Sequence, residues 1–231
     1  MIKFLLPGFY EHNNLFKKII NKYENENYLF NEDIAIGACY GNFQICIWDG
    51  GRTFNSYKQA SKEQIEEMYL YYKQHNIPLR LVFTNPELKK EDLHDRFCNL
   101  VAEICEDENN EIVVNSPLLE KYIREMYPKY KIISSTTKCL TNIENAQDEL
   151  NENYYMVCLD YNLNHNLHFL STIPEENKDK VEFLVNAICP AGCPNRKEHY
   201  RLNGLFYLNY GKQYYINCGI KQGTLDCDSL K

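Results

Sequence analysis

The feature that most constrains the fold is a repeated pattern of a short apolar run, a few polar residues and a helical stretch. Beyond residue 78 the runs begin at intervals of roughly 20 to 32 residues, the spacing of β–α units whose parallel strands are buried. Two earlier runs have the same character. We therefore expect seven strands, at 2–6, 34–39, 79–83, 111–114, 130–134, 155–159 and 181–185.

Helical periodicity fills the segments between these runs. In residues 90–107 the apolar side chains fall on one face of a helix, as they also do in 15–23 and 62–75. The segment 117–127 opens with Pro117 directly after Ser116, which is typical of a helix that starts with proline behind a capping residue. We expect these helices to connect the strands.

Alternation of strands and helices leaves two architectures, an open doubly wound sheet or a closed (β/α)8 barrel. No glycine-rich phosphate-binding motif follows the first run, so the sequence favours an α/β fold of the (β/α)8 TIM-barrel type. The tail 204–223 has the pattern of a hairpin that turns near Tyr210 and Gly211. Either this hairpin supplies the closing strand, or the barrel is incomplete. No linker or internal repeat divides the chain, so we expect one domain over 1–231.

Charge and termini limit the partners and the compartment. The chain carries 25 Lys+Arg and 32 Asp+Glu, a net charge of −7, without a basic stripe, so nucleic acid is not an expected partner. The apolar start ends at Pro7 and Gly8, too early for an export signal or a membrane span. We expect a cytoplasmic protein without a membrane partner, in which the ten cysteines stay reduced or bind metal.

Polar residues follow the predicted strands, where (β/α)8 enzymes place their sites. Asn85 and Asn115 precede Pro86 and Ser116-Pro117, and capping or turn formation explains them well. Lys138 and Asp160 are candidate catalytic residues. Asp160 could bind a substrate hydroxyl or act as a general base. Lys138 could bind an anionic substrate, which we favour, or form a Schiff base if it is desolvated.

A second polar segment follows the strand predicted at 34–39. It contains Trp48, then Asp49, a Gly-Gly pair and Arg52. The glycines would allow a close approach to a ligand whose carboxylate Arg52 binds, but a hairpin turn with Arg52 in solvent is the commoner use of such a pair. We favour the hairpin.

The cysteines divide by position. Cys46, Cys98, Cys105 and Cys158 lie in apolar patterns and are expected to pack as small hydrophobic residues. Cys39, Cys139, Cys189 and Cys193 fall at or just beyond the carboxyl ends of predicted strands, and Cys218 and Cys227 follow in the tail. Thiolates that converge from separate loops suit zinc or an iron–sulfur cluster.

The stretch ICPAGCPNRKEHY contains the pair Cys189 and Cys193, held by Pro190 and Pro194 in a stiff loop. An iron–sulfur cluster is favoured over zinc because the ligands on offer are sulfur atoms. His199 could ligate a metal, act as acid or base, or cap a helix that starts near Asn195.

Two segments, KVEFLVNAICPAGCPNRKEHYR and IVVNSPLLEKYIREMYPKYKIISSTTKCL, resemble the collagenase-like peptidase superfamily, in particular an uncharacterised branch from anaerobes. The resemblance covers about residues 30–200. It implies a (β/α)8-type barrel and one of two activities: peptide-bond hydrolysis, or oxygen-independent hydroxylation with prephenate and an iron–sulfur cluster. Cys189 and Cys193 match cysteines of relatives that carry the cluster. Relatives also continue beyond a tail like this one with a further strand.

Three hypotheses follow. The first is a metal- or iron–sulfur-dependent enzyme with Cys189, Cys193, Cys139 and Cys218 as ligands, in which Asp160, Lys138, Arg196 and His199 handle a small or peptide-like substrate. The second is a ligand-binding or regulatory module on a degenerate barrel, without catalysis. The third is a metal-independent hydrolase with a Cys–His pair that includes Cys193.

Overall fold

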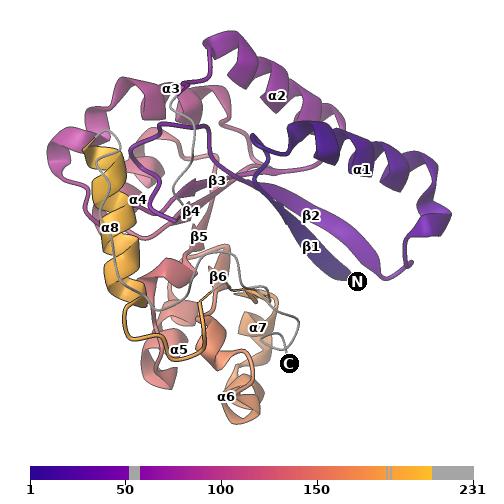
Figure 1. Cartoon of the computed structure of the whole chain (residues 1–231). Coiled ribbons are helices and arrows are strands. Elements are labelled where there is room, and N and C mark those ends of the chain that lie inside the picture. The colour runs from indigo at the N-terminus through magenta and orange to yellow at the C-terminus, as the bar shows by residue number, and fades with distance from the viewer. Residues whose placement is uncertain (52–57, 186, 188, 210–231) are drawn as a thin grey trace.

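Seven parallel strands form one curled sheet in the order β1-β2-β3-β4-β5-β6-β7, an open half-barrel (Figure 1). The computed structural model describes residues 1–51, 58–185, 187 and 189–209. Each strand pairs in parallel with the next one along the chain. The strands are β1 (Ile2–Pro7), β2 (Ile34–Gly41), β3 (Leu79–Phe83), β4 (Glu111–Val114), β5 (Lys131–Ser134), β6 (Met156–Cys158) and β7 (Val181–Glu182).

Helices connect the strands and lie around the outside of the curled sheet (Figure 1). The α-helices are α1 (Asn13–Asn25), α2 (Lys62–Gln74), α3 (Arg96–Ile104), α4 (Pro117–Met126), α5 (Ile143–Asn151), α6 (Leu167–Thr172), α7 (Glu175–Lys178) and α8 (Arg196–Leu208). The 3-10 turns in the described part of the chain are η1 (Asn27–Leu29), η2 (Lys90–His94), η3 (Thr136–Lys138) and η4 (Tyr161–Leu163).

The strand pattern of the sequence is confirmed, with one strand at each predicted run. The fold is an α/β half-barrel consistent with an incomplete TIM-type barrel. Within the described residues β1 and β7 have one neighbouring strand each, so this part of the chain does not close the sheet. The predicted hairpin is wrong at its start, because Gly204–Leu208 belong to α8, where Phe206 and Tyr207 are buried. Residues 210–223 of that prediction lie outside the described residues.

Local chemistry sets where the helices begin. The Ser116 side chain accepts the amide of Leu119, and Pro117 occupies the first turn of α4, as the sequence predicted. At α2, Ser61 and Gln64 form a capping box in which each side chain accepts the other residue's amide. Asp95 caps α3, because its side chain accepts the amide of Cys98. These caps fix the register of each crossover helix.

A buried ion network joins three strands of the sheet. Arg80 on β3 is 2% exposed, and its Nε donates to Glu111 Oε2 on β4 at 2.6 Å. Its Nη1 donates to Glu182 Oε2 on β7 at 2.5 Å. Burial raises the pKa of Glu111, and the guanidinium opposes that shift. One arginine thus joins the middle of the sheet to its last strand, which is two residues long.

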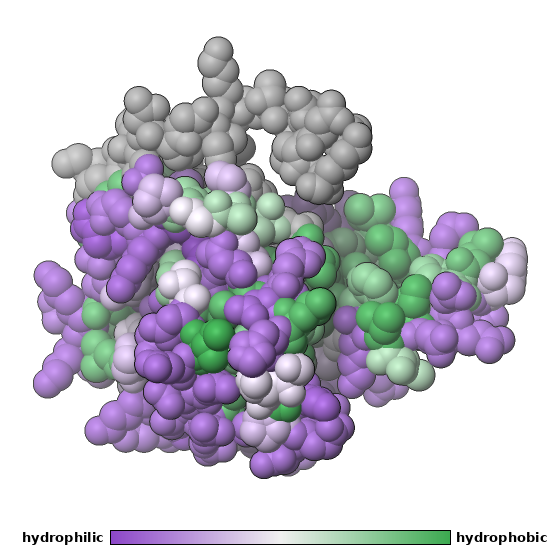
Figure 2. All heavy atoms as spheres, turned by 90° about the horizontal axis from the view of Figure 1, so that it is seen from below, coloured by the Kyte–Doolittle hydropathy of each residue, from purple (hydrophilic) through white to green (hydrophobic). Residues whose placement is uncertain are grey.

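Exposed apolar side chains gather at the open end of the molecule formed by β1 and the turn η1. Figure 2 shows hydrophobic spheres at this end among polar ones. The exposed apolar residues there are Met1, Ile2, Phe4, Tyr28 and Leu29. Among the helices that the structure describes, none is long and apolar enough to cross a membrane.

The Arg80→Met variant should be less stable than the wild type by about 3–5 kcal/mol, because it leaves Glu111 and Glu182 buried without their counter-charge. The matched control is Lys121→Met, which removes an exposed ion pair on α4 and should cost less than about 1 kcal/mol. Urea unfolding measures both. Equal losses of stability in the two variants would show that the Arg80 network stabilises the fold no more than an exposed ion pair does.

Candidate functional site

Polar side chains fill the carboxyl end of the half-barrel. They come from the loops that follow β3, β5 and β6, and most of them are buried. The set is Thr84, Asn85, Ser135, Thr137 and Asp160. In parallel α/β sheets this end carries the ligand-binding loops, so we call it the carboxyl rim and treat it as the candidate site.

The centre of the carboxyl rim is a buried ion pair between Asp160 and Arg196. Asp160 follows β6, and its Oδ1 accepts the backbone and side-chain N–H groups of Asn162 at 3.0 and 2.8 Å. Its Oδ2 contacts Nη2 of Arg196, the first residue of α8. Both side chains are almost fully buried. The sequence named each residue separately as a candidate, and the structure brings them together.

Arg196 also contacts a thiol. Its Nε donates to Cys139 Sγ at 3.3 Å, and its guanidinium carbon lies 4.3 Å from the centre of the Tyr161 ring. Cys139 follows η3 in the left-handed conformation, with φ 55°, which residues other than glycine and asparagine rarely adopt. Within the described residues, Nη1 of Arg196 has no hydrogen-bond partner, so a buried donor is available beside the thiol.

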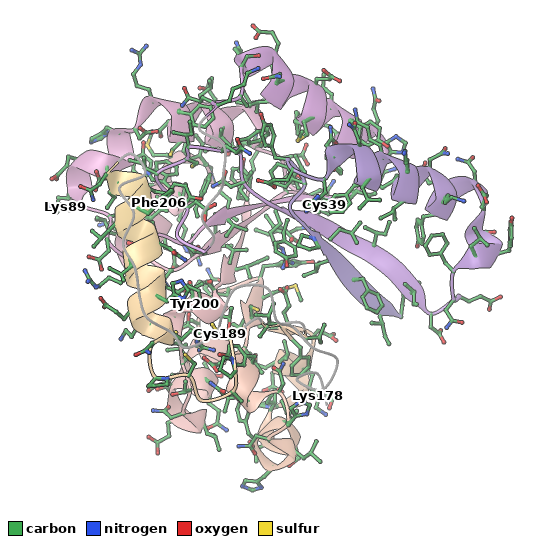
Figure 3. All side chains as sticks on the ribbon, in the orientation of Figure 1. Cys39, Lys89, Lys178, Cys189, Tyr200 and Phe206 are labelled. Atoms are coloured by element: carbon green, nitrogen blue, oxygen red, sulfur yellow. The ribbon has the colours of Figure 1, made fainter. Side chains whose placement is uncertain are left out.

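Tyr161 bonds the cysteine loop at Pro190 O and lies against Arg196, which contacts Cys139. Burial, and then charge on Cys189, Tyr200, Cys193 and Cys139, raises the pKa of the Tyr161 hydroxyl above its usual value. Tyr200, one turn along α8 from Arg196, has its pKa raised to about 12, mainly by burial, and again Cys139 and Cys189 contribute. In Figure 3 Cys189 and Tyr200 lie next to each other at the start of α8.

The cysteine loop is held against the carboxyl rim by hydrogen bonds. The Tyr161 hydroxyl donates to Pro190 O at 3.2 Å, and the Gly192 amide donates to Asn162 Oδ1 at 2.8 Å. Gly192 has φ +70°, a conformation that suits glycine. This loop and the loop after β6 therefore form one unit, as the placement of the motif beyond the seventh strand predicted.

Asn85 fixes the other end of α8, a role that the sequence did not indicate. Its Nδ2 donates to Ile47 O at 2.7 Å and to Gly204 O at 3.1 Å, while its Oδ1 accepts the amide of Glu87. A Cβ at Gly204 would collide with Asn85 Oδ1, so the close approach of α8 depends on this glycine. The turn expected for Asn85 is present, and its second function is to seat a helix.

Other predicted residues take different positions. Lys138 Nζ contacts Glu149 Oε1 at 2.5 Å and the Tyr154 hydroxyl at 2.9 Å, so its charge is paired with α5. Asn115 donates to Thr137 Oγ1. His199 is half-buried on α8, which begins next to Asn195 as predicted. Arg52 and Cys218 lie outside the described residues.

The described thiols do not complete a metal centre. Iron–sulfur clusters are held by four cysteine thiolates, and structural zinc by four Cys or His ligands. Among the residues that the structure describes, no group of three or more His, Cys, Asp or Glu is arranged to hold an ion. Cys139, Cys189 and Cys193 share the carboxyl rim without converging on one point. The metal therefore stays a prediction.

A hollow of about 500 Å³ opens beside the carboxyl rim. It is lined by Thr141, Asn142, Ile143, Glu144, Leu163 and Asn166. Its wall starts close to the rim thiol, because the Thr141 amide donates to Cys139 O at 3.0 Å.

Comparison with solved structures places this fold. The chain resembles the structure of the U32 peptidase Mk0906, with a TM-score of 0.63 over 93% of this chain and 80% of that chain, at 14% identity. The likeness is one of fold, and it confirms at that level the collagenase-like peptidase resemblance seen in the sequence. No family model and no curated protein matches the sequence.

Asp160→Ala should destabilise the chain by about 3–5 kcal/mol, because the buried Arg196 guanidinium would lose its counter-charge. The double variant Asp160→Leu/Arg196→Met should recover most of that loss. Glu198→Gln, which breaks an exposed pair with Arg201, is the control and should leave stability nearly unchanged. Chemical unfolding tests all three. A double variant no more stable than Asp160→Ala would contradict the buried pair.

Proposed function

We propose that this chain is a thiol-dependent enzyme of the collagenase-like peptidase superfamily, which hydrolyses a peptide-like substrate at the carboxyl rim. The observation that carries the proposal is the contact between Cys139 Sγ and the buried guanidinium of Arg196. A cysteine thiol can act as a nucleophile, and the guanidinium N–H groups beside it are placed to stabilise negative charge that develops during the reaction. The peptide-like substrate is proposed by analogy with the structural neighbour, a U32 peptidase.

The residues support a division of roles. Cys139 Sγ would attack the substrate carbonyl carbon, the amine would leave with a proton, and water would then hydrolyse the thioester. Arg196 Nη1 is buried, has no partner within the described residues and could stabilise the developing oxyanion. Asp160 positions the guanidinium. Proton transfer by His199, one turn along α8, completes the proposal.

A second candidate is a metal- or iron–sulfur-dependent enzyme, such as an oxygen-independent hydroxylase. The observation that favours it is that Cys139 contacts Arg196 on the carboxyl rim, where the loop of Cys189 and Cys193 bonds Tyr161 and Asn162. This candidate needs at least one further ligand, for which the sequence offers Cys218.

The alternative without catalysis is a ligand-binding module. It is favoured by the seating of α8 on the carboxyl rim, where Arg196 and Gly204 use the polar groups of Asp160 and Asn85. Lys138 also favours this alternative, because its charge is already paired with Glu149.

The test uses the full chain, purified without oxygen, with assays of peptide hydrolysis and of iron, zinc and sulfide content. Cys139→Ser should lower hydrolysis by about a hundredfold or more, because it removes the nucleophile, while the metal content stays unchanged. The control is Cys105→Ala, which changes a buried cysteine at the end of helix α3 and should keep full activity.

Each other result selects a different function. Hydrolysis that survives in Cys139→Ser contradicts the thiol mechanism. Iron with sulfide that is lost in Cys193→Ser supports the cluster enzyme in its place. A colourless protein with neither metal nor hydrolysis supports the binding module.

A further inference from the structure

We infer that Cys46 and Cys98 form a site of reversible disulfide formation, separate from the carboxyl-rim thiols. Their sulfur atoms lie 3.0 Å apart, and both side chains are fully buried. A disulfide bond is about 2.05 Å long, so the two sulfurs need to approach by only about 1 Å. The cysteines are 52 positions apart in the sequence, so the fold alone brings them together.

Both backbones are held in place independently of the sulfur contact. Cys46 lies in a turn closed by the Asp49 amide, which donates to Cys46 O at 3.1 Å, and the residue before it, Ile45, has φ 67°. Such a conformation is strained for a β-branched residue. Cys98 lies in the first turn of α3, where Asp95 Oδ1 accepts its amide. The contact is therefore a consequence of two fixed segments.

Burial explains why the pair can persist reduced and still be poised to oxidise. Burial and the neighbouring thiol raise the pKa of Cys98, so the thiolate that starts exchange is scarce in the folded chain. The fixed proximity favours the disulfide once it forms. Exchange is expected to begin when the segment around Cys46 opens.

The reaction needs an oxidant, and a low-molecular-weight disulfide such as glutathione disulfide serves. One protein thiolate attacks it to give a mixed disulfide and one released thiol. The second protein thiolate then displaces the other thiol and closes the S–S bond. The protein pair loses two electrons and two protons, and the small disulfide gains two electrons and two protons.

The cross-link would join the segment after β2 to helix α3. The same segment supplies Trp48 O and Ile47 O, which accept the backbone and side-chain N–H groups of Asn85. Asn85 in turn seats α8 at Gly204. The disulfide would therefore stabilise the base on which the carboxyl rim is assembled.

The test is to bring the full chain to equilibrium with glutathione disulfide, both from the folded state and by refolding from urea, so that slow access cannot imitate a negative result. After acid quenching, free thiols are alkylated in denaturant and the chain is digested with trypsin. The expected product links peptide 23–52 to peptide 97–121. Alkylation of both Cys46 and Cys98 in the refolded, oxidised sample overturns the inference.

Matched variants assign the bond. Each of those two peptides holds one further buried cysteine, Cys39 and Cys105. Cys46→Ala and Cys98→Ala should abolish the linked product, whereas Cys39→Ala and Cys105→Ala should keep it. If Cys39→Ala or Cys105→Ala by itself abolishes the linked product, the disulfide involves that cysteine, and the inference is overturned.

The stabilising role has its own readout. The wild type should melt at a higher temperature in the oxidised than in the reduced form, and this difference should disappear in Cys46→Ala. An oxidised wild type that carries the bond but melts no higher than the reduced form contradicts that role.

Discussion

A buried guanidinium joins distant strands of the curled sheet, because Arg80 bonds Glu111 on the neighbouring strand and Glu182 on the last strand. Strand β7 forms few backbone bonds, and within the described residues it has only β6 beside it. The bond from the buried Arg80 guanidinium to Glu182 attaches this short strand, which has few backbone hydrogen bonds, to the rest of the sheet. The network is costly to desolvate. It favours this packing of the strands, because a different packing would leave a charge without a partner in the core.

The carboxyl rim contains a second buried ion pair. There Arg196 is buried against Asp160, and the pair ties helix α8 to the end of β6, while Asn85 and Gly204 tie its other end to β3. With both ends of α8 bonded, the guanidinium of Arg196 lies against Cys139, and the Tyr161 hydroxyl bonds the cysteine loop. A catalytic or binding site requires side chains that are held in place by their neighbours in this way.

Most of the fold could be predicted from the sequence, because buried parallel strands give apolar runs and crossover helices give a regular period. The carboxyl rim followed from strand order, which placed Asp160 and the cysteine loop together. What could not be predicted was pairing across the barrel. The signal for one such pairing was present, because the apolar runs contain Arg80, Glu111 and Glu182. Three charges in buried strands indicate that they neutralise one another. The partners of Lys138 and the seat of α8 depend on side-chain directions, which periodicity does not give.

The most direct test of this account is amide hydrogen exchange on the Glu182→Gln variant. Strand β7 protects two amides of the β6 segment, because Val157 donates to Lys180 O at 2.7 Å and Leu159 to Glu182 O at 3.0 Å. With the bond from Arg80 weakened, these two amides should exchange about tenfold faster or more, while the Ser135 amide, which donates to Val114 O, keeps its rate. Unchanged exchange at Val157 and Leu159 would contradict the claim that the buried arginine holds the last strand of the sheet.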